Sequence, residues 1–250
     1  MTDTERASTE ICGFDADTIL LRGKNLVDEV IGQYSLTGAF LLQALGKEPT
    51  ARQIELLDVV LVTIMEHGLV PSVVASRLTF HGAPESMQGA VAAGLLGVGD
   101  RYAGTAAQCG EVLSQLIASD DMASAARELV GRYRSQKTPV PGFGHPIHTG
   151  KDPRVEKLLS YVSEDSKAFQ AAKSLEVALS EALGKPLVMN VSTVLAILMF
   201  EIGIPVSAMR GVILISRCAG LVGHLLEETE APVGNSLWRG AEGSVDYQSR

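Results

Sequence analysis

TARQIELLDVVLVTIMEHG, residues 50–68, decides the fold class of this chain. Its apolar side chains recur at spacings of three and four residues, which places them along one stripe of an α-helix. Thr50 and Gln53 have the spacing of a capping box at the helix start, and Gly68 is a typical helix stop. His67 is therefore expected in the last turn, where a histidine more often interacts with the helix dipole than takes part in chemistry.

The same spacing continues through most of the 250 residues, and convincing alternation with a period of two is absent. The sequence therefore predicts an all-α fold. Each further helix has a polar residue that can cap its start. The expected caps and their helices are Asp152 for 153–164, Ser166 for 167–183, Asn190 for 191–203 and Ser207 for 208–228. The tail, 231–250, has no periodicity and is expected to form a loop.

The composition restricts the possible partners. Apolar residues make up 46% of the chain, but no uninterrupted apolar run approaches the roughly 20 residues that a membrane span needs. Residues 1–17 are polar and acidic, without the apolar segment of an export signal, so a cytoplasmic protein is expected. A net charge of −8 disfavours nucleic acid and anionic membrane surfaces as partners, because both require a positive face.

The cysteines favour neither a disulfide framework nor a metal centre. Cys12, Cys109 and Cys218 are odd in number and widely spaced, and no CxxC pair occurs. This pattern argues against disulfides and against a zinc site, so no metal is expected. Buried free thiols are the default expectation.

One segment departs from the acidic average of the chain. Residues 131–157 contain six lysines and arginines against two acidic residues. The segment includes PGFGHPIHTGKDPR, residues 141–154, which concentrates prolines, glycines and histidines in an otherwise helical chain. On composition alone, a solvated surface run and a binding site for an anionic small ligand explain this charge equally well.

Three polar residues need an explanation beyond helix formation. His145 lies in a loop between a glycine and a proline, where helix hydrogen bonding cannot account for it, so it is a candidate for chemistry. Arg154 occupies the second position of its helix, where a cation is disfavoured, so either a ligand anion or a salt bridge to Glu156 or Glu201 must compensate. Arg217 lies in an apolar helix and needs an anionic partner if that helix is buried.

Five segments, in order along the chain, resemble the citrate synthase superfamily. They are EHG at 66–68, VGDRYAG at 98–104, PGFGHPIHTGKDPR at 141–154, MNVS at 189–192 and SRCAGLVGH at 216–224. The short length and the GDRYAG segment are most like citryl-CoA lyases and the citrate synthase-homology domain of ATP-citrate lyase. The resemblance implies an all-helical, two-domain subunit in an intertwined dimer, with the active site between the domains. Its large domain would be 1–108 plus 206–250, and its small domain 109–205.

The resemblance also implies roles for particular residues. His67 would contact the ligand's hydroxyl or carboxylate, and His145 would transfer the proton of the hydroxyl that becomes a carbonyl. Arg154 and Arg217 would hold carboxylates. A coenzyme A thioester is the implied substrate, with no metal. Its CoA part would lie along the segment formed by Lys137, Val140, Pro141, Gly142, Phe143 and Gly144.

The sequence departs from the family pattern at three places. Ser192 follows NV, where the superfamily has its catalytic aspartate. A serine hydroxyl hardly ionises near neutral pH, whereas an aspartate with an ordinary pKa of about 3.9 is a ready base, so deprotonation of an acetyl-CoA methyl group should be impaired. Ser192 can still hold a water. Tyr102 stands where citrate synthases have a histidine, and it either donates to the enolate oxygen or packs as a core aromatic. Arg239, after Trp238, is the candidate for the arginine that the partner's C-terminal segment usually contributes.

These observations predict a citryl-CoA lyase-like enzyme. It would cleave a carboxylated β-hydroxyacyl-CoA into a smaller acyl-CoA, of the acetyl-CoA type, and an oxo acid such as oxaloacetate, as a homodimer or higher homo-oligomer. One alternative is a condensing acyltransferase of the citrate synthase type, which the missing aspartate and histidine disfavour. Another is a CoA-thioester-binding paralogue with lost or altered catalysis. Ser192 motivates it, and the retained histidines and arginines oppose it.

Overall fold

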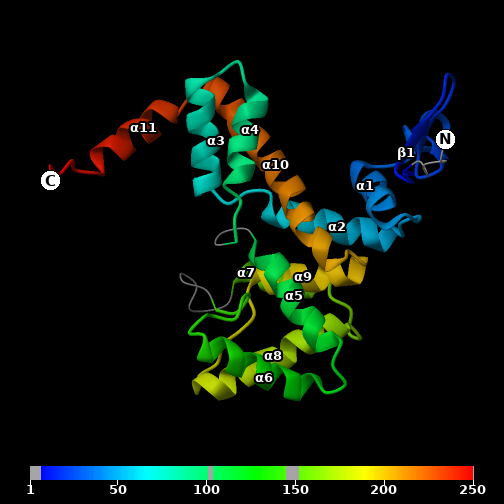
Figure 1. Cartoon of the computed structure of the whole chain (residues 1–250), viewed down its shortest axis with the longest axis vertical. Helices are drawn as coiled ribbons and strands as arrows, with labels where there is room; N and C mark the ends of the chain where they lie inside the picture. The colour runs from blue at the N-terminus through cyan, green and yellow to red at the C-terminus, as the bar shows by residue number, and fades with distance from the viewer. Residues whose placement is uncertain (1–6, 101–103, 145–151, 250) are drawn as a thin grey trace, which may run out of the picture.

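The structure is a computed structural model that describes residues 7–100, 104–144 and 152–249. Within these ranges the fold is all-α apart from a small sheet, as the sequence predicts (Figure 1). The helices are the π-helix η1 (Leu26–Val30) and the α-helices α1 (Leu36–Leu45), α2 (Ala51–Ile64), α3 (Pro71–Gly82), α4 (Met87–Leu96), α5 (Thr105–Ile117), α6 (Met122–Ser135), α7 (Pro153–Leu159), α8 (Lys167–Leu183), α9 (Val191–Ile202), α10 (Val206–Glu230) and α11 (Gly234–Gly243).

The sheet near the N-terminus is an element that the sequence did not predict. Its strands β1 (Cys12–Phe14), β2 (Ile19–Leu21) and β3 (Lys24–Asn25) pair antiparallel in that order. Strands of two or three residues are too short for an alternating pattern to be recognised. Cys12 is exposed on β1, contrary to the expectation of buried thiols, whereas Cys109 is buried in α5.

Most of the expected helix starts are confirmed. Thr50 and Gln53 form a capping box, in which the Gln53 backbone N–H donates to Thr50 Oγ1 at 3.2 Å and the Thr50 N–H donates to Gln53 Oε1 at 2.9 Å. The caps of α7, α8 and α9 are Asp152, Ser166 and Asn190, respectively. These caps succeed as predictions because they depend only on residues within one turn.

Three local expectations are wrong. His67 lies beyond the end of α2 at Ile64 rather than in its last turn. Ser207 is not a cap, because α10 starts at Val206 with Pro205 at the N-cap, where the missing proline N–H costs nothing. The tail forms α11, whose start is held by a carboxylate of α10 that local periodicity does not reveal.

Helix α10 joins the parts of the molecule. It packs against α5 and α2 in its first half and against α3 and α4 in its second half. The larger core combines α1, α2, α5 to α9 and the start of α10, and a smaller cluster of Phe80, Ala90 and Leu225 joins α3 and α4 to the end of α10. Among the described helices, α10 is long and apolar enough to cross a membrane by length and composition, yet it packs within this helical body.

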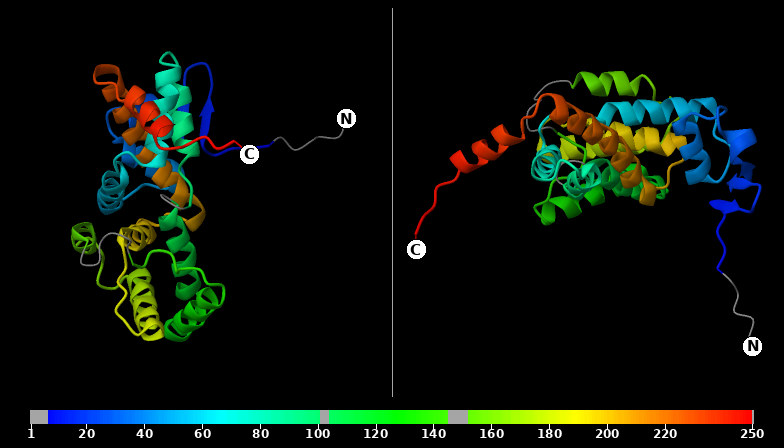
Figure 2. Two further views of the ribbon diagram at one scale, coloured as in Figure 1. Left: turned by 90° about the vertical axis from the view of Figure 1, so that its left-hand side faces the viewer. Right: turned by 90° about the horizontal axis from the view of Figure 1, so that it is seen from above.

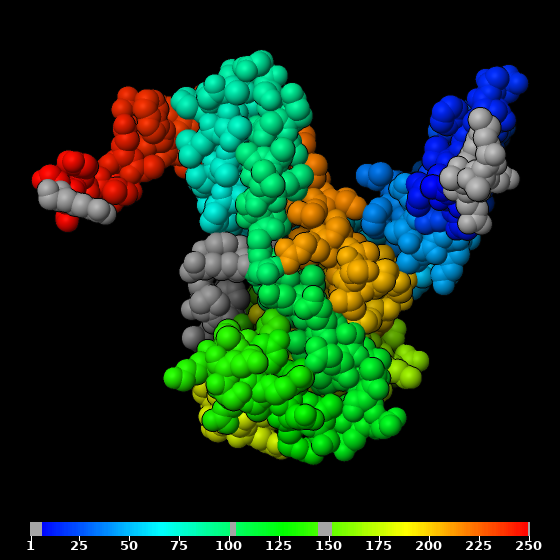
Figure 3. Space-filling view, in the orientation of Figure 1, coloured from blue at the N-terminus to red at the C-terminus, as the bar shows by residue number. Residues whose placement is uncertain are grey.

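The two ends of the chain project from opposite sides of the helical body (Figure 2). The N-terminal sheet stands beside α1, and α11 extends outward from α3 (Figure 1). In the space-filling view, these ends and the α3–α4 hairpin form separate projections (Figure 3). The helical body therefore presents concave surfaces between them.

Candidate active site

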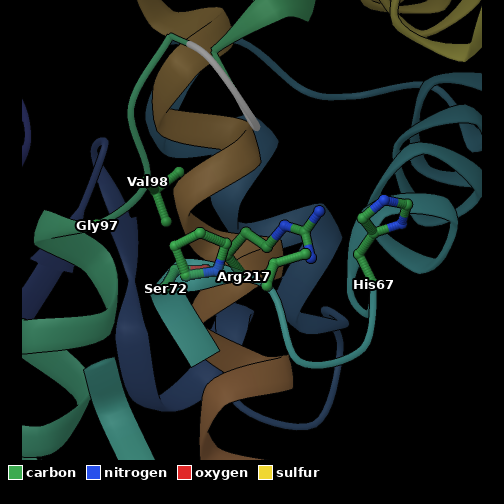
Figure 4. A pocket seen from close by; sticks show the side chains of 7 residues that line it. His67, Ser72, Gly97, Val98 and Arg217 are labelled. Carbon is green, nitrogen blue, oxygen red and sulfur yellow. The ribbon is translucent and has the colours of Figure 1, made fainter. Parts of the chain in front are cut away.

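One candidate pocket forms where the turn after α2 meets α10 and the end of α4. His67 and Arg217 line it together (Figure 4). The remaining lining residues are Val70, Pro71, Ser72, Gly97 and Val98. Figure 4 shows the Arg217 guanidinium extending toward the side of the pocket on which His67 lies. The structure thus brings together two residues that are 150 positions apart in the sequence.

The electrostatics of the pocket are dominated by Arg217. This residue is half-buried, and burial lowers the pKa of its guanidinium, while the negative charge of Glu66 opposes the shift. Within residues 7–100, 104–144 and 152–249, no acceptor lies within hydrogen-bond reach of the guanidinium. A half-buried cation without a hydrogen-bonded anion is costly, so Arg217 is well suited to receive a carboxylate from a ligand.

Close backbone packing sets the position of Arg217. A Cβ atom on Gly220 would overlap the carbonyl oxygen of Met65, so only glycine lets α10 lie directly on the end of α2. Ser216 Oγ donates to the Leu61 carbonyl at 2.5 Å, one turn away. These contacts fix the register of α10 against α2 and place Arg217 beside the turn that carries His67.

A second part of the candidate site is the loop at 141–144, which is attached to the start of α9. The carbonyl oxygen of Gly142 accepts from the Asn190 backbone N–H at 2.8 Å and from Thr193 Oγ1 at 2.7 Å. Gly144 donates its N–H to the Val188 carbonyl at 3.0 Å, and Asn190 Nδ2 donates to the Gly144 carbonyl at 3.1 Å. The loop is therefore held by main-chain groups up to the residue that precedes His145.

Gly142 is required in this loop for two reasons. Its φ of +86° is unfavourable for other residues, and a Cβ atom would overlap Thr193 Oγ1 and the Cys109 sulfur. The Cys109 thiol is fully enclosed, and burial raises its pKa to about 12. Cys109 thus acts as a small packing group, because a thiol with so high a pKa supplies almost no thiolate.

Ser192 lies in the first turn of α9, next to this loop. Its backbone N–H donates to Asn190 Oδ1 at 2.9 Å, and the residue is half-buried. Its neighbour Thr193 is fully buried and uses its hydroxyl to hold the Gly142 carbonyl. The two adjacent hydroxyls therefore differ, since that of Thr193 supports the loop while that of Ser192 is not engaged by any described residue.

Arg154 has its compensating anion at the helix start itself. The guanidinium forks onto the carboxylate of Asp152, with Nε 3.2 Å from Oδ1 and Nη2 2.9 Å from Oδ2. Glu201, one of the expected partners, instead accepts from the Ser163 N–H and Oγ, each at 3.0 Å. Asp152 therefore serves as cap and counterion at once, which resolves the misplaced charge predicted at this position.

Arg239 and Lys137, two further predicted site residues, do not line this pocket. Arg239 lies on α11, pairs with Glu242 at 2.8 Å and stacks 4.4 Å from the Trp238 ring, so its predicted role depends on a second subunit. Lys137 is exposed at the end of α6 with a φ of +55°. Tyr102 and His145 lie outside the described residues. No group of three or more His, Cys, Asp or Glu side chains suited to a metal ion occurs in the described parts of the chain.

Sequence reasoning missed the charged residues around the pocket. In the sequence, Glu66 and His224 stand out only as parts of the EHG and SRCAGLVGH segments, and Arg77 lies in no motif. His224 lies seven residues after Arg217 and therefore on the same face of α10. The spacing of Arg217, His224 and Glu228, at seven and then four residues, is the feature of the sequence that indicates a polar stripe on one face of this helix.

Comparison with known proteins establishes the family. The model of the citrate synthase C-terminal domain matches residues 16–241, and the chain therefore belongs to this family. The predicted resemblance is thus confirmed. Within the family, the chain is similar to the solved structure of citryl-CoA lyase from Hydrogenobacter thermophilus, with a TM-score of 0.84 and 27% identity over 98% of this chain and 95% of that one.

Further relatives are larger proteins. The chain is 29% identical to a citrate synthase of Haloferax volcanii over 199 residues, which cover 76% of this chain and 51% of that protein. The structure of ATP citrate lyase from Methanothrix soehngenii in complex with citrate and coenzyme A matches 100% of this chain and 43% of that one, with a TM-score of 0.78 and 22% identity, which shows a shared fold. The chain spans about half the length, or less, of the curated relatives it matches.

Proposed function

We propose that this chain is a citryl-CoA lyase-like carbon–carbon lyase acting on a carboxylated β-hydroxyacyl-CoA. The observation that carries the proposal is the half-buried Arg217 guanidinium, which faces the His67 pocket without a hydrogen-bonded anion. A carboxylate of the substrate is the natural partner for such a group. The likeness to citryl-CoA lyase over nearly the whole of both chains supports this reaction over others of the family.

Each residue then has a defined task. Arg217 holds a carboxylate, Arg154 holds a second one with the edge of its guanidinium that Asp152 leaves open, and His67 contacts the hydroxyl or a carboxylate. His145 removes the hydroxyl proton, so that the oxygen becomes a carbonyl as the carbon–carbon bond breaks. The electron pair of that bond passes to the thioester as an enolate, which a donated hydrogen bond, for example from Tyr102, stabilises. Protonation of the enolate carbon gives the smaller acyl-CoA, and the oxo acid is the second product.

Ser192 bears on the direction of this reaction. A thioester enolate is a strong base and can take a proton from a water held by Ser192. The reverse step, removal of a methyl proton, needs a base that a serine hydroxyl does not provide near neutral pH. The citrate synthase-like condensation is therefore the second candidate, favoured only by the curated relatives that carry that name. A CoA-thioester-binding paralogue is the third.

We also propose a cytoplasmic homodimer in which residues 1–108 with 206–250 form the large domain and 109–205 the small one. Only 33% of the apolar window of α10 is buried within the chain. Exposed apolar side chains on the C-terminal part include Leu226, Trp238 and Tyr247. A second copy that covers these surfaces would remove their apolar area from water. It would also bring Arg239 of α11 toward the partner's pocket.

Two assays test the proposed function. The first offers a panel of carboxylated β-hydroxyacyl-CoAs and follows release of the oxo acid, which the lyase proposal expects. The second incubates the protein with acetyl-CoA in heavy water and measures deuterium in the methyl group. Methyl exchange without an added acceptor would contradict the role given to Ser192. Tight CoA binding with neither activity would favour the paralogue.

A further inference from the structure

A chain of polar contacts, exposed at Glu66 and buried at Arg77 and Glu228, links the turn that carries His67 to the start of α11. We call it the Glu66–Glu228 relay, and it consists of Glu66, His224, Arg77 and Glu228. Its members come from the turn after α2, from α3 and from the second half of α10. None of them has a role in the proposed chemistry, and Arg77 and Glu228 are only 2% and 5% exposed. Buried charges of this kind need a reason beyond stability, because apolar residues often pack as well.

At one end of the relay, Glu66 holds the turn around His67. Its Oε1 accepts from the backbone N–H groups of His67 at 2.7 Å and Gly68 at 2.5 Å. Partial burial acts to raise the pKa of the Glu66 carboxyl, but the contact with His224 and these two backbone bonds outweigh it, so the pKa is lowered. The conformation of the His67 backbone therefore depends on where the Glu66 carboxylate is placed.

In the middle of the relay, His224 has a defined tautomer. Its Nδ1 lies 3.2 Å from Arg77 Nε and 2.7 Å from Arg77 Nη2. A guanidinium has no acceptor, so Nδ1 must accept, and the ring hydrogen belongs on Nε2. Nε2 lies 2.8 Å from Glu66 Oε2, a close contact in which the ring N–H is not aligned as a hydrogen bond to that oxygen. Arg77 thus orients His224, and His224 packs its Nε2 edge against Glu66.

At the other end, Glu228 joins Arg77 to α11. Glu228 Oε2 accepts from Arg77 Nη1 at 2.5 Å, and Glu227 also pairs with this guanidinium. Glu228 Oε1 accepts from the backbone N–H groups of Val233 at 2.9 Å and Gly234 at 2.6 Å, which are the first groups of α11. One carboxylate therefore holds both the buried arginine and the start of the C-terminal helix.

The close approach at Gly234 makes this end of the relay sensitive to a single added methyl group. A Cβ atom there would lie 2.7 Å from the His81 Cβ and 2.9 Å from Glu228 Oε1. Gly240, in the same helix, has no atom within 4 Å of the equivalent position. The chain thus offers a matched pair of substitutions in α11, one that strains the relay and one that leaves it intact.

We propose that Glu66, His224 and Arg77 are positioning residues that set the His67 turn and the charge beside Arg217, and that the seating of α11 through Glu228 acts on the pocket along the same relay. Arg217, His224 and Glu228 lie on one face of α10, so the helix that carries the pocket's guanidinium also carries two members of the relay. The part of this inference that concerns substrate affinity rests on the proposed function. The conformation of the His67 turn can be measured independently of any catalytic activity.

The first experiment compares His224→Gln with His224→Leu. The glutamine amide supplies an acceptor for Arg77 and a donor for Glu66, whereas leucine supplies neither. Histidine side-chain ¹⁵N spectra of the intact protein should show hydrogen on Nε2 of His224. We expect the His67 signals to move in His224→Leu and to stay close to the wild type in His224→Gln. KM for the carboxylated acyl-CoA should rise roughly 10-fold in the leucine variant and much less in the glutamine variant.

The second experiment compares Gly234→Ala with Gly240→Ala. We expect Gly234→Ala to shift the His67 signals and to raise KM several-fold, and Gly240→Ala to change neither. Unmoved His67 signals in Gly234→Ala, together with hydrogen found on Nδ1 of His224, would overturn the inference even if His224→Leu fails to fold. If the wild-type protein cleaves no tested acyl-CoA, the proposed function fails, while the ¹⁵N spectra still decide whether the relay positions His67.

Discussion

The two parts of the candidate site are held in different ways. The loop at 141–144 is held through its own main-chain groups, by bonds from the backbone and from the side chains of Asn190 and Thr193, and by the absence of a side chain at Gly142. The pocket of His67 and Arg217 is lined instead by small and apolar residues around one guanidinium, and the contacts of the neighbouring Glu66 run through side chains of α10 and α3. Backbone contacts tolerate most substitutions except at glycine, whereas a charged pocket is altered by any change of charge. The loop is therefore expected to govern stability, and the pocket ligand affinity.

The largest effect in this comparison is expected at Arg217. Arg217→Met keeps the apolar stem but removes the charge that awaits a ligand carboxylate, so affinity for the carboxylated substrate should fall by about 2 kcal/mol or more, which is roughly 30-fold. The midpoint of thermal unfolding should stay unchanged or rise, because a half-buried cation is lost. Calorimetric titration and a thermal melt test both expectations. Arg217→Lys keeps the charge but lacks the forked guanidinium, so its affinity for the substrate should lie between those of the wild type and of Arg217→Met. A large loss of stability would show that Arg217 is structural.

On the loop side, the largest effect is expected at Gly142. Gly142→Ala forces alanine into a positive φ and against Thr193 and Cys109, so the free energy of unfolding should drop by about 2 kcal/mol or more. Gly131→Ala, in the open interior of α6, is the matched control and should stabilise by about 0.5 kcal/mol. Urea unfolding measures both. An unchanged midpoint for Gly142→Ala would refute the view that this loop is held by close packing.

A smaller effect separates the two neighbouring hydroxyls of α9. Thr193→Val removes the donor to the Gly142 carbonyl and should cost about 1 kcal/mol of stability. Ser192→Ala should change stability by less than about 0.5 kcal/mol, since its hydroxyl holds no described residue, but it should slow turnover if Ser192 holds the proton-donating water. Equal stability losses in the two variants would argue against this division of roles.

The smallest effect concerns the pH dependence of folding stability, which becomes measurable only in acid. Bonds from Arg77 and from the α11 backbone lower the pKa of the Glu228 carboxyl below its ordinary 4.5, against the opposing influence of burial. A carboxyl whose pKa is lower in the folded than in the unfolded state stabilises the fold at pH values above its ordinary pKa. This stabilisation is lost progressively as the pH falls from the ordinary pKa through the folded-state pKa. Stability should therefore decline below about pH 4.5, and Glu228→Gln should weaken this decline, whereas the exposed Glu230→Gln should not. Parallel urea titrations between pH 3 and pH 7 provide the measurement.

Local features of this chain were predictable from the sequence, and the structure confirms most of them. The caps Thr50, Asp152, Ser166 and Asn190 and the all-α class follow from residues within one helical turn. The ion pair of Arg154 with Asp152 is equally local, because the two residues are only two positions apart at the start of one helix, although the sequence pattern by itself indicates only the cap. The β-strands were missed because they are too short for a pattern.

By itself, the sequence determined the helical class, most helix starts and the residues that mark the citrate synthase family, since each depends on a local pattern. Only the tertiary structure decided that His67 and Arg217 share a pocket and that His224 joins Arg77 across 147 positions. It also decided that α11 exists, because its first N–H groups are held by a carboxylate of α10. The physical reason is the same in each case. A buried charge takes its partner from whichever element packing brings within hydrogen-bond distance, and no local spacing encodes that choice.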